Sequence, residues 1–103
     1  MAGQHLYFIQ AKATGAVKVG KSDDPQRRLR QLQTGNPTTL RVILFAPDRG
    51  CDEQRVHNAL RRHRTRHTHG GEWFKEECLG DVPVDIWEFT EPWYRDDPDW
   101  WKR

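Results

Sequence analysis

The chain has 103 residues, of which 35% are hydrophobic and 31% charged, and this length allows one small domain with a modest core. No run of residues approaches the ~20 consecutive apolar residues of a membrane helix, and the first residues lack the apolar segment of a secretory signal. Two cysteines, Cys51 and Cys78, lie far apart in the sequence and are typical of a reducing compartment. We therefore expect a cytoplasmic protein that has no membrane partner.

Charge is unevenly distributed along the chain. Residues 1–70 carry 13 Lys and Arg against 5 Asp and Glu, whereas residues 71–103 carry 4 against 10, together with all five Trp. A basic excess of this size attracts polyanions, and phosphate backbones are the commonest such partner. We expect a basic domain, residues 1–80, that binds DNA, followed by an acidic aromatic extension, residues 81–103, packed on it or appended to it.

The first predicted element is a β-hairpin. Residues 6–10 and 16–20 are rich in β-branched and aromatic side chains and flank a turn-like segment. A four-residue loop sets Tyr7 opposite Gly20 and Ile9 opposite Lys18, so that Tyr7 and Lys18 share the functional face. In this register the other face of the hairpin is uniformly apolar, with Leu6, Phe8, Val17 and Val19.

A helix and a third strand follow the hairpin. Asp24 is a suitable N-cap, Pro25 fits the first helical position, and Gly35 with Pro37 ends a helix of about ten residues. Residues 40–46 then predict a strand, because they form a short, mostly apolar run.

Residues 52–64 predict a second helix that Asp52 caps. Glu53 and His57 lie four residues apart beside its apolar stripe and therefore point inward. An inward carboxylate costs free energy unless a cation, a metal ion or hydrogen bonds meet it. The stripe itself consists of Val56, Ala59, Leu60 and His63.

Beyond this helix, we expect a loop and a short helix over residues 67–79 and an edge strand within residues 81–92. The predicted fold class is therefore α/β (α+β), with a small, mainly antiparallel three-stranded sheet flanked by helices.

Residues from separate elements fit the hydrolysis of phosphodiester bonds. That reaction needs a group that activates water, cations that offset the developing negative charge, and usually a divalent ion held by a carboxylate. A single inward Glu is an adequate anchor for Mg²⁺, which fills its other positions with water and phosphate oxygens. The candidates are Tyr7, Lys18, Gly20, Arg28, Glu53 and His57.

Four segments occur in order over residues 5–77, namely LYFIQ, VKVGKSDDPQRRLRQLQTGNP, EQRVH and GEWF. Together they resemble the GIY-YIG nuclease superfamily, in particular its compact branch found in phage and in meiotically upregulated eukaryotic proteins. The resemblance implies a GIY-YIG-like fold and metal-dependent endonuclease activity on DNA. The chain departs from the family where His5 and Leu6 replace the Gly-Ile of the first motif and where Lys18 replaces the second tyrosine.

The resemblance also implies a role for each matching residue. Tyr7 takes a proton from the attacking water, Glu53 holds one Mg²⁺ or Mn²⁺, and Arg28 binds a phosphate oxygen. A tyrosine with its ordinary pKa of ~10 acts as a base only if neighbouring cations or the metal lower that pKa. Lys18 and Arg28 are the candidates for this effect.

His57 has two interpretations. It is either a proton relay or partner of a metal ligand, or a structural histidine bonded to the backbone. Gly20 and Trp73 are expected to have structural roles beside the site. The cations expected to bind nucleic-acid phosphates are Lys21, Arg27, Arg30, Arg61, Arg62, Arg64 and Arg66.

Two other functions fit the same sequence. One is a non-catalytic nucleic-acid-binding module, in which Lys18 marks lost chemistry and Glu53 is structural. The other is a scaffold whose Trp-rich tail recruits a protein partner or a second copy of the chain.

Overall fold

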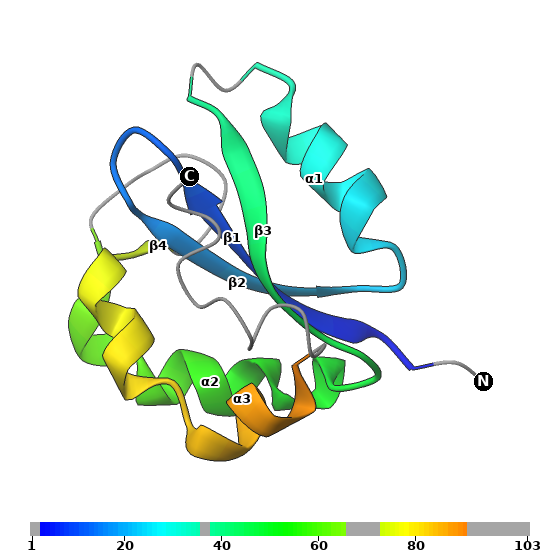
Figure 1. Cartoon of the computed structure of the whole chain (residues 1–103), viewed down its shortest axis with the longest axis vertical. Coiled ribbons are helices and arrows are strands. Elements are labelled where there is room, and N and C mark those ends of the chain that lie inside the picture. The colour runs from blue at the N-terminus through cyan, green and yellow to red at the C-terminus, as the bar shows by residue number, and fades with distance from the viewer. Residues whose placement is uncertain (1–2, 36–37, 66–72, 91–103) are drawn as a thin grey trace.

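The computed structural model describes residues 3–35, 38–65 and 73–90. Figure 1 shows a sheet with helices on both sides of it. The strands are β1 (His5–Ala11), β2 (Val17–Ser22), β3 (Leu40–Ala46) and β4 (Trp73–Phe74), and the helices are α1 (Pro25–Gln33), α2 (Glu53–Ala59) and α3 (Val84–Phe89), with short 3₁₀ turns η1 (Gly50–Asp52), η2 (Arg61–His63) and η3 (Glu76–Asp81).

The sheet has the order β3-β1-β2-β4, and every neighbouring pair is antiparallel. The predicted hairpin register is confirmed, because Tyr7 lies opposite Gly20 and Ile9 lies opposite Lys18. The predicted α+β class with a small antiparallel sheet is therefore confirmed, with one strand more than expected.

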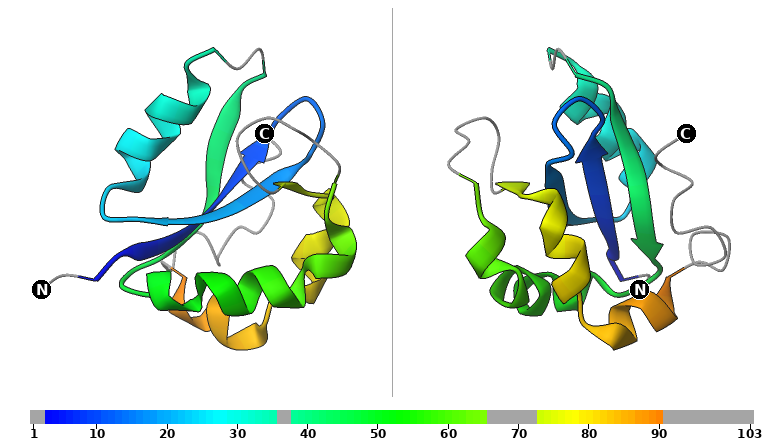
Figure 2. Two further views of the ribbon diagram at one scale, coloured as in Figure 1. Left: turned by 180° about the vertical axis from the view of Figure 1, so that it is seen from behind. Right: turned by 60° about the vertical axis from the view of Figure 1, so that its left-hand side comes forward.

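Each face of the sheet has its own apolar cluster. The face that carries Leu6, Phe8 and Val17 packs against α2 and α3, which contribute Val56 and Ile86. The face that carries Tyr7 and Ile9 packs against α1, which contributes Leu29 and Leu32. Figure 2 shows α1 well separated from α2 and α3. Tyr7 therefore lies on the face of the sheet that α1 covers.

The start of α1 is as predicted. The Asp24 carboxylate accepts a hydrogen bond from the Arg27 backbone N–H at 3.0 Å, and Pro25 occupies the first turn. The Asp24 carboxylate accepts from one of the N–H groups that have no partner within the helix, and Pro25 fits the first helical position, so the helix starts here. These two residues fix which residues of α1 face the sheet.

The predicted edge strand within residues 81–92 is wrong. Residues 84–89 form helix α3, in which Ile86 is fully buried, and the C-cap residue Thr90 four residues later is buried too. This four-residue spacing suits a helical face that packs on the core. The edge of the sheet is instead β4, where Trp73 pairs with Lys18.

The second helix is shorter than predicted and is not capped by Asp52. It ends at Ala59, and Asp52 makes no capping hydrogen bond because its carboxylate is bound by Arg49 and Arg55. Val56 and Leu60 are buried as predicted, whereas Ala59 is exposed and His63 is only half-buried.

No helix in the described ranges is both long and apolar enough to cross a bilayer. The core includes Val82 and Ile86, which lie beyond the predicted domain boundary at residue 80, and that boundary stays a prediction. The predicted interaction role of the Trp-rich tail falls mostly on residues 91–103, outside the described residues.

Candidate active site

Tyr7 and Gly20 form the floor of the candidate site. Tyr7 is 2% exposed, and its ring crosses over Gly20 on the neighbouring strand. A Cβ atom at position 20 would lie 2.5 Å from the Tyr7 Oη and 2.6 Å from its Cζ. Only a residue without a side chain leaves room for the phenol here, and this explains the structural role predicted for Gly20.

Arg28 from α1 and Glu53 from α2 both act on the Tyr7 phenol. Burial raises the pKa of Tyr7 above its usual value, because the phenolate loses its hydration. The Arg28 guanidinium opposes this rise in pKa by donating a hydrogen bond and by its charge, whereas the Glu53 carboxylate adds to it. The structure therefore brings together three predicted site residues that lie far apart in the sequence.

Burial decides the balance of effects on the Tyr7 pKa. Arg28, one of the two cations expected to be able to lower this pKa, does act in that sense, but burial raises it by more. The phenol is consequently protonated at neutral pH. Sequence alone could not supply this balance, because the extent of burial depends on how α1 covers the sheet.

His57 contacts the backbone of β2. Its Nε2 lies 2.9 Å from the Val19 carbonyl oxygen, and its ring meets Phe74 edge-on at 5.6 Å. When Nε2 carries the proton it donates to this carbonyl, and the ring orientation is fixed. This contact fits the structural interpretation of His57, while its catalytic role stays a prediction.

Lys18 lies beneath Trp73 on the face that it shares with Tyr7. Its side chain is 9% exposed, and its Nζ lies 5.9 Å from the centroid of the Trp73 ring. An ammonium over an indole face is stabilised by the ring quadrupole. Trp73 is itself 8% exposed and belongs to the apolar cluster around Tyr7, and this placement fits the structural role predicted for it.

Glu53 is half-buried at the first turn of α2, where it can anchor one hard divalent ion. Among the described residues, no group of three His, Cys, Asp or Glu lies close enough to hold a metal ion together. Mg²⁺ and Mn²⁺ fit a single carboxylate, because they keep several waters and share phosphate oxygens of a substrate. The residues present therefore fit the expected cofactor.

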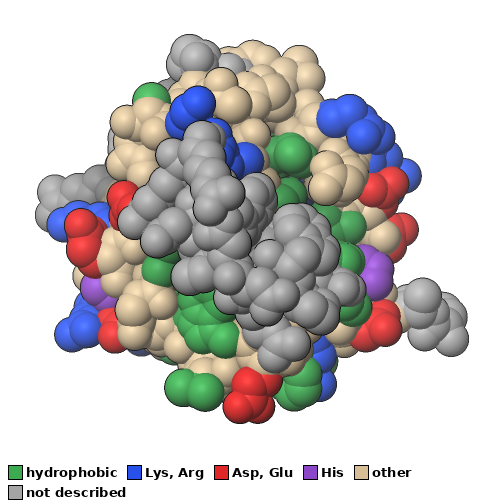
Figure 3. Space-filling view, viewed as in Figure 1, with side chains coloured by type: hydrophobic (Ala, Val, Ile, Leu, Met, Phe, Trp, Pro, Cys, Tyr) green, Lys and Arg blue, Asp and Glu red, His purple; other side chains and the backbone are tan. Residues whose placement is uncertain are grey.

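The predicted phosphate-binding cations fall into two groups. Lys21, Arg28 and Arg30 are exposed on the α1 side and form no ion pair with a described carboxylate. On the α2 side, Arg62 forms an ion pair with Asp81 at 2.6 Å. Figure 3 shows Lys and Arg side chains over α1 at the upper right and at the lower left of the molecule, in both places next to acidic ones. The α1 side is thus the better-placed surface for a polyanion.

The remaining predicted cations have varied surroundings. Arg27 pairs with Asp23 at 3.3 Å, and the Arg61 guanidinium donates to the Asn58 side chain at 3.1 Å. Arg64 forms an isolated β-bridge with Phe74, and Arg66 lies outside the described residues.

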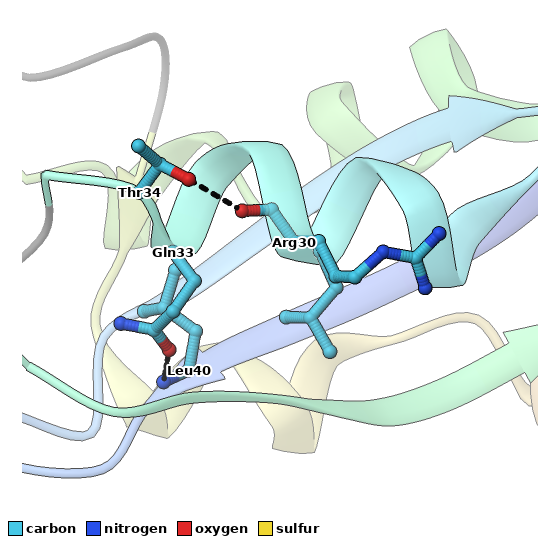
Figure 4. A pocket seen from close by; sticks show the side chains of 5 residues that line it. Arg30, Gln33, Thr34 and Leu40 are labelled. Atoms are coloured by element: carbon cyan, nitrogen blue, oxygen red, sulfur yellow. Dashed lines mark hydrogen bonds between the residues drawn. The ribbon is translucent and has the colours of Figure 1, made fainter.

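A separate shallow pocket of about 310 Å³ lies where α1 ends against β3, and none of the predicted catalytic residues lines it (Figure 4). Its Gln33 side chain accepts a hydrogen bond from the Leu40 N–H at 2.8 Å and so links helix to strand. Leu29, Arg30 and Thr34 complete the lining.

Sequence reasoning missed the residues that surround the start of α2. Arg49 and Arg55 lie three residues before and after Asp52, and both bind its carboxylate. This i, i+3 spacing of alternating charge was the available signal.

The chain was compared with known protein families, curated proteins and solved structures. The T5orf172 domain family matches residues 4–90. The chain belongs to this family. T5orf172 domains are found in nuclease-related proteins, so the family supports a nuclease-like or nucleic-acid-binding module. No curated protein and no solved structure matches the chain significantly.

The T5orf172 match extends through α3 and ends with the described part of the chain. It includes every residue that contributes to the candidate site. The family therefore covers both the basic domain and the first acidic residues after it.

Proposed function

We propose that this T5orf172 domain is a GIY-YIG-type endonuclease that hydrolyses phosphodiester bonds in DNA with one Mg²⁺ or Mn²⁺. The observation that supports it best is the convergence of Tyr7, Arg28 and Glu53 from β1, α1 and α2. A phenol, a guanidinium and a carboxylate are the groups that this reaction requires. If Tyr7, Arg28 and Glu53 were unrelated surface or core residues, no effect of Arg28 and Glu53 on the pKa of Tyr7 would be expected.

Each residue has a distinct task in this proposal. The Arg28 guanidinium binds non-bridging oxygens of the scissile phosphate and offsets the charge that develops there, a task that suits its planar fork. Glu53 holds the divalent ion, which supplies positive charge at the phosphate and reverses the effect of Glu53 on the pKa of Tyr7. Lys18 is buried beneath Trp73, so its ammonium group moves less freely than that of a surface lysine. It adds a fixed positive charge to the face of the sheet that carries Tyr7.

Tyr7 holds its proton on Oη in the free protein, because burial and Glu53 raise its pKa. In that state Oη can donate a hydrogen bond to a phosphate oxygen or accept one from water. Its action as a base requires a lower pKa, which Arg28 favours and burial, the largest cause of the rise, opposes. A divalent ion held by Glu53 would act in the same sense as Arg28.

Cleavage of supercoiled plasmid in the presence of Mg²⁺ or Mn²⁺ tests the proposal. We expect the wild-type protein to nick or linearise the plasmid, and we expect Glu53→Gln and Tyr7→Phe to lose most of this activity. Glu88→Gln is the matched control, because Glu88 is an exposed carboxylate on α3 away from the site. The proposal fails if wild type and the two site variants leave the plasmid equally intact.

A non-catalytic nucleic-acid-binding module is the second candidate. The replacement of the second motif tyrosine by the buried Lys18 favours it, because a phenol is lost from the site. Binding that persists in EDTA, weakens steeply with salt and is unchanged in Glu53→Gln would support this function.

The two groups of cations provide a further comparison for DNA binding. We expect Lys21→Gln and Arg30→Gln to lower the salt dependence of binding by about one counterion each. Arg62→Gln should lower it less, because Arg62 is already paired with Asp81. Equal losses from the two sides would contradict the assignment of the α1 side.

A further inference from the structure

The carboxylate of Asp52 lies at the centre of an ion-pair network beside the proposed metal ligand. Its side chain is only 13% exposed. The Arg49 Nε donates to Oδ2 at 2.8 Å and its Nη2 lies 2.8 Å from the same oxygen, while the Arg55 Nη2 lies 3.3 Å from Oδ1. Each oxygen of Asp52 therefore faces one guanidinium group. The sequence places two adjacent carboxylates here, but only Glu53 is left without an arginine clamp of this kind.

Both arginines also contact α3, which comes from the acidic part of the chain. Arg55 forms two hydrogen bonds with Asp85, at 3.1 and 2.7 Å, and the Arg49 guanidinium lies 4.0 Å from the centroid of the Phe89 ring. Asp85 and Phe89 are four residues apart and so lie on the same face of α3. One face of α3 thus contacts the start of α2 at two points, with Asp52 between them.

The opposite side of this corner rests against the chain just before β1. The Gly50 N–H donates a 2.7 Å hydrogen bond to the Gln4 carbonyl oxygen. A Cβ atom at position 50 would lie 2.7 Å from that oxygen, so any side chain at this position would clash with the backbone of Gln4. The segment that leads into Glu53 is therefore held from both sides.

We propose that α3 is a clamp which, through Arg49, Asp52 and Arg55, positions the Glu53 carboxylate for its divalent ion. Asp52 is a positioning residue in this arrangement and not a second ligand. Two guanidinium groups offset its charge and occupy its oxygens, while its place next to Glu53 in the chain transmits the constraint. The inference rests on the proposed function and adds to it that the start of the acidic extension supports the active site.

The ion pair of Asp85 provides the most accessible perturbation. Its side chain is 44% exposed, so Asp85→Asn removes the charge without opening the core. Asp81→Asn is the matched control, because Asp81 is a half-buried carboxylate of the same region, with a side chain 31% exposed, that pairs with Arg62 and His63 instead. Asp85→Glu keeps the charge and should restore part of the contact.

Binding of Mn²⁺ to the purified full chain, followed by electron paramagnetic resonance, measures the effect without relying on activity. We expect Asp85→Asn to raise the Kd for Mn²⁺ by about tenfold, the lower end of what loss of a partner that orients a metal ligand costs. We expect Asp81→Asn to leave this Kd unchanged and Asp85→Glu to lie between the wild type and Asp85→Asn. Thermal unfolding of each variant separates this effect from a general loss of stability.

The outcomes separate this inference from the proposed function. If Glu53→Gln weakens Mn²⁺ binding but Asp85→Asn does not, or if Asp81→Asn weakens it as much, the clamp alone is refuted. If Glu53→Gln binds Mn²⁺ as tightly as the wild type, the assigned metal site is refuted and the clamp with it. A higher Kd for Mn²⁺ in Asp85→Asn, with an unchanged melting temperature, supports the clamp.

Discussion

Gly20→Ala gives the sharpest test of the site geometry, because one added methyl group would meet the Tyr7 phenol. The new Cβ would lie 2.5 Å from Oη, 2.6 Å from Cζ and 3.1 Å from Cε2. Tyr7 is 2% exposed and has no open space into which it can move. Overpacking of this kind costs about 1–3 kcal/mol of unfolding free energy. For a domain of this size, each kcal/mol lowers the melting temperature by about 4–8 °C.

The sign of the effect should change when the ring of Tyr7 is removed. Gly20 does not have a positive φ, so alanine meets no backbone strain there. In a Tyr7→Leu background, alanine should stabilise the strand by about 0.5–1 kcal/mol relative to glycine. The coupling between the two positions is therefore about 1.5–4 kcal/mol, a value that a double-mutant cycle can resolve.

Urea unfolding of the four variants, monitored by circular dichroism, measures this coupling. Tyr7→Phe is the control, because phenylalanine keeps the Cζ atom and should leave Gly20→Ala destabilising. If Gly20→Ala costs the same free energy in the wild-type and Tyr7→Leu backgrounds, the ring does not lie over position 20. That result would refute the close packing on which the site depends.

Three further predictions concern other parts of the molecule. Iodoacetamide should modify exposed Cys51 in the native protein but not Cys78, because burial raises the pKa of Cys78 to about 12. Peptide mass spectrometry identifies the modified cysteine, and modification of Cys78 in the native protein would contradict this prediction. Asp24→Ala should cost about 1 kcal/mol in urea unfolding, because it removes the cap of α1, and an unchanged midpoint would argue against the cap. Folding raises the pKa of Tyr7, so the folded state holds this proton more tightly, and the unfolding free energy should fall as the pH rises from about 10 through the raised pKa. Tyr7→Phe should lack this part of the fall between pH 9 and pH 11, and an identical slope in both proteins would be evidence against it.

Local signals in the sequence were sufficient for the hairpin, α1 and β3. A period of two residues sets which face of a strand is apolar, and one register alone places Tyr7 opposite Gly20 while keeping Lys18 off the uniformly apolar face of the hairpin. The cap at Asp24 and the proline after it likewise act within one helical turn. Contacts of this range depend on neighbours in the sequence, and they can be predicted without knowing the rest of the fold.

The end of α2 and the nature of residues 84–89 could not be found in this way. Asp52 precedes α2 and resembles a helix cap in the sequence. Its carboxylate instead forms ion pairs with Arg49 and Arg55 and makes no capping hydrogen bond. The segment around Ile86 is compatible with a strand or a helix, and packing against the core selects the helix. Tertiary contacts override a weak local preference in both cases.

The sequence by itself determined which chemical groups the site contains, because Tyr7, Arg28 and Glu53 lie in elements whose exposed and inward faces follow from residue spacing. Only the tertiary structure decided how these groups influence one another. The pKa of Tyr7 rises because its phenol is buried, and the helix that carries Glu53 is joined to α3 by the ion pair of Arg55 with Asp85. Burial and ion pairing are properties of distances between remote segments, and those distances exist only in the folded chain.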